Sequence, residues 1–142
     1  MKRTPQDFFS SPIGETLTFE KCITCGPMTN LEEVIQLVAK HNIGALVVVE
    51  NSHPIGIITE RDFMTKVLPQ KIDFRSALVG TFMTSNPTCV RRDAPMNRIM
   101  AALRLGRFRH LIVTDEQNNL IGVISMKDIF YRLDDFFRES AT

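Results

Sequence analysis

Cysteine, net charge and long apolar runs are all scarce in this 142-residue sequence. Its 17 Lys and Arg residues balance 16 Asp and Glu residues to a formal net charge of +1, so no global field would hold nucleic acid or an anionic membrane. The longest uninterrupted aliphatic run, Ala45 to Val49, is far too short to cross a bilayer. We therefore expect a folded cytoplasmic protein without a membrane segment.

The three cysteines are too few, and odd in number, for the disulfide framework of a small secreted domain, so we expect reduced thiols. Cys22 and Cys25 have the C-x-x-C spacing of a redox pair or half a metal site. In an extended segment, however, residues i and i+3 point to opposite faces, and no second such pair is present. The sequence also has no Gly-x-Ser-x-Gly elbow. We expect neither a metal site nor an enzyme.

An internal repeat organises the chain, with an offset of 66 residues. Residues 55–63 (IGIITERDF) align with residues 121–129 (IGVISMKDI), and four of the nine positions are identical. At the same offset the segment beginning at Ile13 aligns with that beginning at Val79. Two repeats therefore account for nearly everything after Pro12.

The hydrophobic period changes in the same way within each repeat. Apolar residues at i, i+3, i+4 and i+7 predict a helix that begins near Leu31, with Thr29 and Glu32 spaced as a capping box, and another that begins near Met96. Short β-branched runs predict strands at 46–49, 55–58, 111–114 and 120–124, and extended pieces open the repeats at 22–25 and 88–90. Second helices are predicted from 60 to about 68, halted by Pro69, and from 126 to about 137. The order strand, helix, strand, strand, helix indicates an α/β fold.

One run of residues makes a family resemblance specific. Residues 56–62 (GIITERD) and 122–128 (GVISMKD) both follow the pattern Gly, two apolar residues, Thr or Ser, two further residues and Asp. With the element order and the repeat length, these runs resemble a tandem pair of cystathionine-β-synthase (CBS) domains, the Bateman module. The resemblance implies two β-α-β-β-α units packed with pseudo-twofold symmetry, a first domain at 13–70, a second at 79–137 and an N-terminal extension at 1–12.

Thr59 with Asp62, and Ser125 with Asp128, stand where a strand gives way to a helix. Free backbone N–H groups gather at such a junction, which suits a phosphate, and an ionised carboxylate can accept hydrogen bonds from both hydroxyls of a ribose. The same spacing is also that of a capping box, and capping alone would explain both pairs.

The resemblance implies a non-catalytic regulatory module that senses an adenosyl ligand: AMP, ADP, ATP or S-adenosylmethionine, with no metal required. It implies that the two Asp residues bind ribose, that Thr59 and Ser125 bind phosphate, and that Arg109 or His110 is a further phosphate partner. Small Ala45 would accommodate an adenine. The remaining candidates for ligand binding are Arg61, Lys127 and Ile23.

A homodimer is expected, because a chain this short cannot cover both faces of four amphipathic helices. We expect an isologous contact at Leu68 and at Phe136 or Phe137, and an output that passes through a separate effector protein. One alternative is a dimerising scaffold whose Thr and Asp pairs only cap helices. Another is an RNA-contacting module that uses the six arginines between 91 and 109, disfavoured because no aromatic residues for stacking are interleaved with them.

Overall fold

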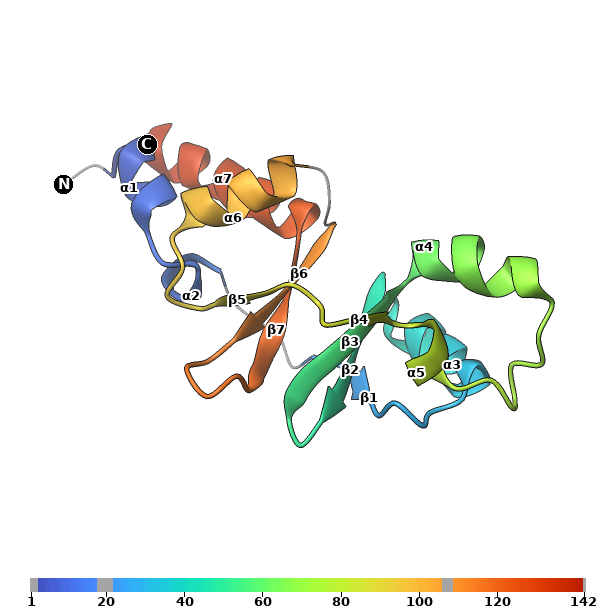
Figure 1. Cartoon of the computed structure of the whole chain (residues 1–142). Helices are drawn as coiled ribbons and strands as arrows, with labels where there is room; N and C mark the ends of the chain where they lie inside the picture. The colour runs from blue at the N-terminus through green and yellow to red at the C-terminus, as the bar shows by residue number, and fades with distance from the viewer. Residues whose placement is uncertain (1–2, 18–21, 106–108, 142) are drawn as a thin grey trace. The chain divides into compact units, whose positions relative to one another are not determined.

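The computed structural model describes residues 3–17, 22–105 and 109–141 and divides into two compact units (Figure 1). The first-repeat unit comprises Lys21–Thr88 with Asn118–Leu120. The second-repeat unit comprises Met1–Glu20, Cys89–Gln117 and Ile121–Thr142. Each unit combines one sheet with helices, which confirms the predicted α/β class.

A four-stranded sheet with the order β1-β2-β3-β4 forms the frame of the first-repeat unit. β1 lies parallel to β2, whereas β3 is antiparallel to both β2 and β4. A π-helical turn (Phe63–Val67) and a 3-10 turn (Leu68–Gln70) extend α4 into one continuous helical segment. The other elements are β1 (Thr24–Cys25), α3 (Leu31–His41), β2 (Ala45–Glu50), β3 (His53–Thr59), α4 (Glu60–Asp62), α5 (Val79–Phe82) and β4 (Thr84–Ser85).

The second-repeat unit has a three-stranded sheet with the order β5-β6-β7. β5 lies parallel to β6, as β1 does to β2, so the order of elements within the repeat is kept. Its elements are α1 (Pro5–Ser10), α2 (Ile13–Thr16), β5 (Cys89–Arg91), α6 (Met96–Arg104), β6 (His110–Thr114), β7 (Leu120–Ser125) and α7 (Met126–Ala141).

Helix α3 begins at Leu31, as the sequence predicts, but the residue that caps it differs from the predicted one. Asn30, not Thr29, is the N-cap, and its side chain accepts a hydrogen bond from the Glu33 backbone N–H at 2.8 Å. The Thr29 carbonyl instead accepts a hydrogen bond from the N–H of Val79, which holds Thr29 outside the helix. A tertiary contact therefore selects between two adjacent capping residues.

Two prolines that the sequence places just outside a predicted strand and a predicted helix lie inside those elements in the structure. Pro54 lies within β3, because Asn51 and Ser52 alone form the turn from β2, both with positive φ. Pro69 lies in the first positions of the 3-10 turn that follows the π-helical turn, so the helical path continues to Gln70. Proline is tolerated in the first positions of a helical turn, where the missing N–H costs no hydrogen bond.

The short helix α2 opens the predicted first domain but packs in the second-repeat unit. The Ile13 N–H donates to the Ala94 carbonyl at 2.9 Å, and the Gly14 N–H donates to the Arg92 carbonyl at 2.8 Å. Ile13 is fully buried in the core of that unit.

Helix α5, the equivalent of α2 at the 66-residue offset, packs in the first-repeat unit in the same manner. The Val79 N–H donates to the Thr29 carbonyl at 2.8 Å, and the Gly80 N–H donates to the Pro27 carbonyl at 3.0 Å. Val79 is fully buried. The segment that opens each predicted domain therefore packs in the unit formed mainly by the other repeat.

Helix α1 contributes to the core of the second-repeat unit through Phe8, which is 4% exposed. The centroid of the Phe8 ring lies 5.3 Å from the Phe136 ring centroid and 5.4 Å from the Phe9 ring centroid. Phe136 is therefore a core residue of this unit, whereas Phe137 and Leu68 stay exposed. Among the described residues, no helix has both the length and the apolar character that a membrane span requires.

Candidate functional site

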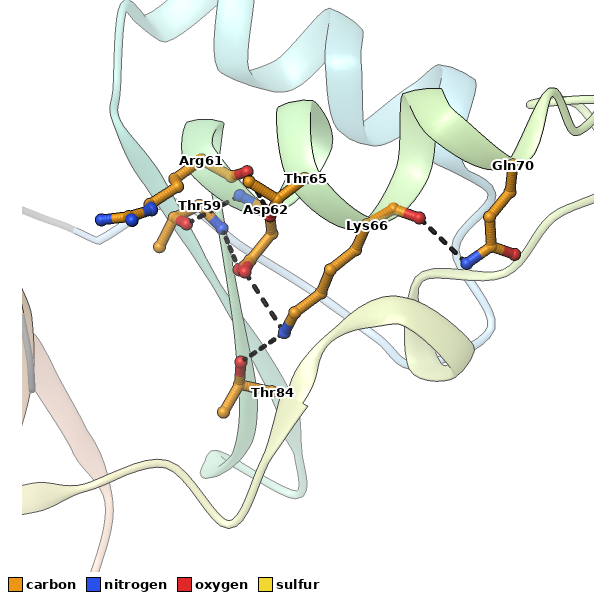
Figure 2. Close-up of polar contacts among 7 residues, drawn as sticks. All are labelled: Thr59, Arg61, Asp62, Thr65, Lys66, Gln70 and Thr84. Atoms are coloured by element: carbon orange, nitrogen blue, oxygen red, sulfur yellow. Dashed lines mark hydrogen bonds and ion pairs between the residues drawn. The ribbon is translucent and has the colours of Figure 1, made fainter.

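The strand-to-helix junction of the first repeat forms a complete capping box. The Thr59 backbone N–H donates to Asp62 Oδ2 at 2.9 Å, and the Asp62 N–H donates to Thr59 Oγ1 at 3.2 Å (Figure 2). The capping alternative is thus realised in the structure. It uses one carboxylate oxygen of Asp62 and leaves the other for a second partner.

That second partner is Lys66, one helical turn further along the chain (Figure 2). Its Nζ lies 3.3 Å from Asp62 Oδ1 and donates to Thr84 Oγ1 at 3.3 Å. The Asp62 side chain is only 14% exposed, while that of Lys66 is 47% exposed. The Lys66 ammonium therefore contacts both the Asp62 carboxylate and the Thr84 hydroxyl.

The equivalent junction of the second repeat forms the same box with a more accessible carboxylate. The Ser125 N–H donates to Asp128 Oδ2 at 2.8 Å, the Ser125 hydroxyl lies 3.0 Å from the same oxygen, and the Asp128 N–H donates to Ser125 Oγ at 3.3 Å. Asp128 is exposed, and within the described parts of the chain no cation lies within ion-pair distance of it. Its Oδ1 atom is available to a ligand.

Arg132 occupies the position in α7 that Lys66 occupies after α4, but its side chain points elsewhere. Arg132 Nε donates to the Thr16 carbonyl at 2.6 Å, and Arg132 Nη1 lies 3.8 Å from Asp135 Oδ2. Two basic residues at equivalent positions therefore have different partners: Lys66 contacts the junction Asp of its repeat, whereas Arg132 contacts the Thr16 carbonyl and Asp135.

A hollow of about 270 Å³ lies beside Asp128 in the second-repeat unit. Its size is near the lower end of the range for small-molecule sites. An apolar floor beside two carboxylates and one guanidinium suits a ligand with a flat apolar part and hydrogen-bond donors. The residues that line it include Leu17, Val123, Ile124, Asp128, Arg132 and Asp135.

The structure brings Ala45 to the first-repeat junction. Ala45 begins β2 and pairs with Thr59 at the end of β3. Ile23 is half-buried, directly precedes β1 and packs against the core of this unit. Arg61 is exposed and extends away from the Asp62 carboxylate (Figure 2).

Arg109 and His110 stand at the start of β6, and Ser125 at the end of β7. Because a five-residue turn joins these neighbouring strands, both positions lie at the same end of the hairpin. Arg109 is exposed and His110 is half-buried. Lys127 points to the Tyr131 ring, with Nζ 5.7 Å from its centroid. The start of β6 and the start of α7 therefore carry three basic side chains, those of Arg109, His110 and Lys127.

Sequence reasoning missed Lys66 as the partner of Asp62 and Thr84 as the partner of Lys66. The available signal was the i,i+4 spacing of Asp62 and Lys66 on a predicted helix, which favours an ion pair. Nothing in the local sequence indicated Thr84, because the docking of α5 and the pairing of β4 with β3 bring it there.

Cys25 is buried, and Cys22 and Cys89 are half-buried. Burial raises the pKa of the Cys25 thiol to about 11 and also raises the pKa of Cys22 and of Cys89. A raised pKa disfavours the thiolate that metal binding and redox exchange need. Among the described residues no three His, Cys, Asp or Glu side chains are grouped as metal ligands.

Comparison with known proteins gives consistent matches. The family model described as CBS domain matches residues 15–69 and again residues 79–135. An uncharacterized protein of Methanopyrus kandleri is 32% identical over 108 residues, which are 75% of this chain but 55% of the relative, so the chain spans about half of that protein.

Two solved structures have the same fold. A CBS domain protein from Pyrobaculum aerophilum, complexed with AMP, superposes with a TM-score of 0.78 at 22% identity, covering 92% of this chain and 98% of that one. The CBS domain pair of another protein, in complex with 5-methylthioadenosine and S-adenosyl-L-methionine, gives a TM-score of 0.76 at 22% identity, covering 89% and 98%.

Proposed function

The chain belongs to the CBS domain family, with two CBS domains in tandem, and we propose that it is a non-catalytic regulatory module that binds an adenosyl ligand such as AMP, ADP, ATP or S-adenosylmethionine. The observation that carries this proposal is the carboxylate of Asp128, which a capping box orients while Oδ1 stays available beside a hollow. The two solved structures with adenosyl ligands have this fold and support the ligand class.

The chemistry of the junction fits the parts of a nucleotide. Asp128 Oδ1 has lone pairs for the two hydroxyls of a ribose, and the apolar side of the hollow can cover a purine face. The N-terminus of the 16-residue helix α7 favours a phosphate through its free N–H groups and its dipole. Arg109 and His110, at the same end of the β6–β7 hairpin, would add positive charge for the phosphates.

Signalling would follow from a population shift. A ligand that binds one arrangement of the chain better than another favours that arrangement by its differential affinity. The output would reach an effector protein that contacts one of these arrangements.

Calorimetric titration of the full chain with AMP and with S-adenosylmethionine tests the ligand class. Asp128→Asn keeps the side-chain shape and can still cap α7, but it loses the charged acceptor for ribose. Since a hydrogen bond to a charged group is worth about 1.5–3 kcal/mol, the affinity should fall by at least tenfold. Asp134→Asn is the matched control, because Asp134 lies in the same helix but pairs with Arg138.

Two results would contradict the proposal. The first is unchanged affinity in Asp128→Asn. The second is no measurable binding of either ligand by the wild-type chain, because Asp128 would then act only as a cap.

We also propose a homodimer, formed through the apolar groove between α6 and α7. The groove has a volume of about 790 Å³, and Phe130 on its rim is 62% exposed. A second copy of the chain would cover this surface. Sedimentation at micromolar concentration should show twice the 16.2 kDa chain mass, and Phe130→Asp should shift the chain to monomer. A wild-type chain that sediments as a stable monomer would refute the dimer.

A further inference from the structure

The carboxylates of Asp62 and Asp128, the two candidate ribose binders, differ in the protein groups that contact them. In the first repeat Asp62 Oδ2 accepts the Thr59 N–H and Oδ1 contacts the Lys66 ammonium, so both oxygens have a partner from the protein. In the second repeat, the polar contacts of Asp128 within the described parts of the chain all involve Ser125, and none uses Oδ1.

The partner of the second carboxylate oxygen affects how readily a ribose can bind. The two adjacent hydroxyls of a ribose need lone pairs of the carboxylate on its accessible side. At Asp62 the Lys66 ammonium lies against Oδ1, and the carboxylate side chain is only 14% exposed. A ligand there must displace the ammonium before its hydroxyls can donate to Oδ1.

Lys66 is also restrained at a second point. Its Nζ donates to Thr84 Oγ1, and Thr84 is fixed by β4, which pairs with β3 next to the junction. Displacement of Lys66 therefore breaks two contacts. At the equivalent position Arg132 donates to the Thr16 carbonyl, so no comparable group has to leave Asp128.

We propose that Lys66 is a specificity-determining residue that occupies the Asp62 carboxylate, so that an adenosyl ligand binds at the second-repeat junction in preference to the first. The inference rests on the proposed function, since it concerns the same ligand class. It makes the two junctions unequal through one side chain rather than through the capping boxes, which are alike.

The expected size of the effect follows from the exposure of Lys66. A half-exposed ion pair is screened by solvent and contributes little, which corresponds to a factor of up to about five in a binding constant. Removal of the ammonium should therefore tighten binding at the first-repeat junction by up to about fivefold and leave the second-repeat junction unchanged.

The test is an NMR titration of the ¹⁵N-labelled full chain with adenosine, and separately with AMP. The backbone amides of Thr59 and Ser125 report the two junctions independently. Lys66→Met keeps a long unbranched side chain but removes the charge. Arg75→Met is the matched control, because it breaks an exposed ion pair with Glu32 in the same unit, 3.2 Å long, away from the junction.

In the wild-type chain the Ser125 amide should shift at lower adenosine concentration than the Thr59 amide. In Lys66→Met the midpoint for Thr59 should fall by up to about fivefold, with no change for Ser125, and Arg75→Met should move neither midpoint.

Other results would overturn the inference. A Thr59 midpoint that is unchanged or higher in Lys66→Met, while Ser125 still responds, refutes the role of Lys66 and leaves the proposed function intact. A loss of AMP binding at Thr59 without a change for adenosine identifies Lys66 as a phosphate partner and also refutes occupation. If neither amide responds to either compound, the proposed function fails and the inference fails with it.

Discussion

A methyl group added at Gly80 tests how tightly α5 docks in the first-repeat unit. The Cβ of Gly80→Ala would lie 2.9 Å from the Pro27 carbonyl oxygen, below the 3.0 Å that real Cβ atoms essentially never pass. The carbonyl cannot turn away without losing its hydrogen bond from the Gly80 N–H. Either this hydrogen bond or the neighbouring one from Val79 to Thr29 must lengthen.

The magnitude combines two opposing effects. Overpacking of this kind costs about 1–3 kcal/mol, while replacing Gly with Ala recovers about 0.4–1 kcal/mol by restricting the unfolded chain. We expect Gly80→Ala to lower the free energy of unfolding by about 1–2 kcal/mol. For a chain of this length, the melting temperature should then fall by roughly 3–8 °C.

Gly26→Ala is the matched control, since a Cβ at Gly26 meets no atom within 4 Å. It should be neutral or slightly stabilising, because only the effect on the unfolded chain remains. Urea denaturation at several protein concentrations measures both variants and separates folding from dimer dissociation. Equal stability of Gly80→Ala and Gly26→Ala would refute the close docking of α5.

Three further outcomes follow from single residues. Burial raises the folded-state pKa of Cys25 to about 11 from 9.0, so the free energy of unfolding should be intact below pH 9 and fall as the pH rises towards 11. Urea midpoints should show this loss in the wild-type chain and a smaller loss in Cys25→Ala. Equal losses in the two chains would contradict the prediction. Arg109→Ala should weaken ATP binding more than AMP binding in calorimetry, because a guanidinium can hold additional phosphate oxygens in a bidentate manner, and equal losses would count against the assignment. Phe8→Ala should cost about 3–5 kcal/mol in urea denaturation by emptying the space beside Phe136, and a change below 1 kcal/mol would show that α1 is not part of the core.

The sequence predicted the repeated order of elements because the hydrophobic period records it locally. The stripes of α3 and α6 and the β-branched run of β3 are properties of neighbouring residues, and the structure confirms the helices and the strand that they predict. Element ends were less accurate where distant residues decide them. Asn30 replaces Thr29 as the N-cap because Val79 binds the Thr29 carbonyl, and Val79 is 50 residues away in sequence.

The candidate site shows the same division between local and distant causes. Both capping boxes follow from four-residue spacings, and the structure forms both. The packing of α2 with the second-repeat unit could not be derived from periodicity, although the alignment of Ile13 with Val79 already marked the two segments as equivalent. Sequence equivalence indicated a shared role without indicating the unit in which each segment packs.

Lys66 and Arg132 show why equivalent residues can give a duplicated fold two unequal sites. Both are basic and stand one helical turn after a junction Asp, so charge and spacing alone predict the same ion pair in each repeat. The single ammonium of Lys66 has Asp62 and Thr84 within reach, whereas the longer, planar guanidinium of Arg132 reaches a backbone carbonyl at Thr16. An Arg132→Lys exchange would remove that planar donor and allow an ammonium to approach Asp128. We expect adenosyl binding at the second-repeat junction to weaken in this variant, and an unchanged Ser125 midpoint in the NMR titration would show that the partner of the basic residue does not decide which carboxylate is available.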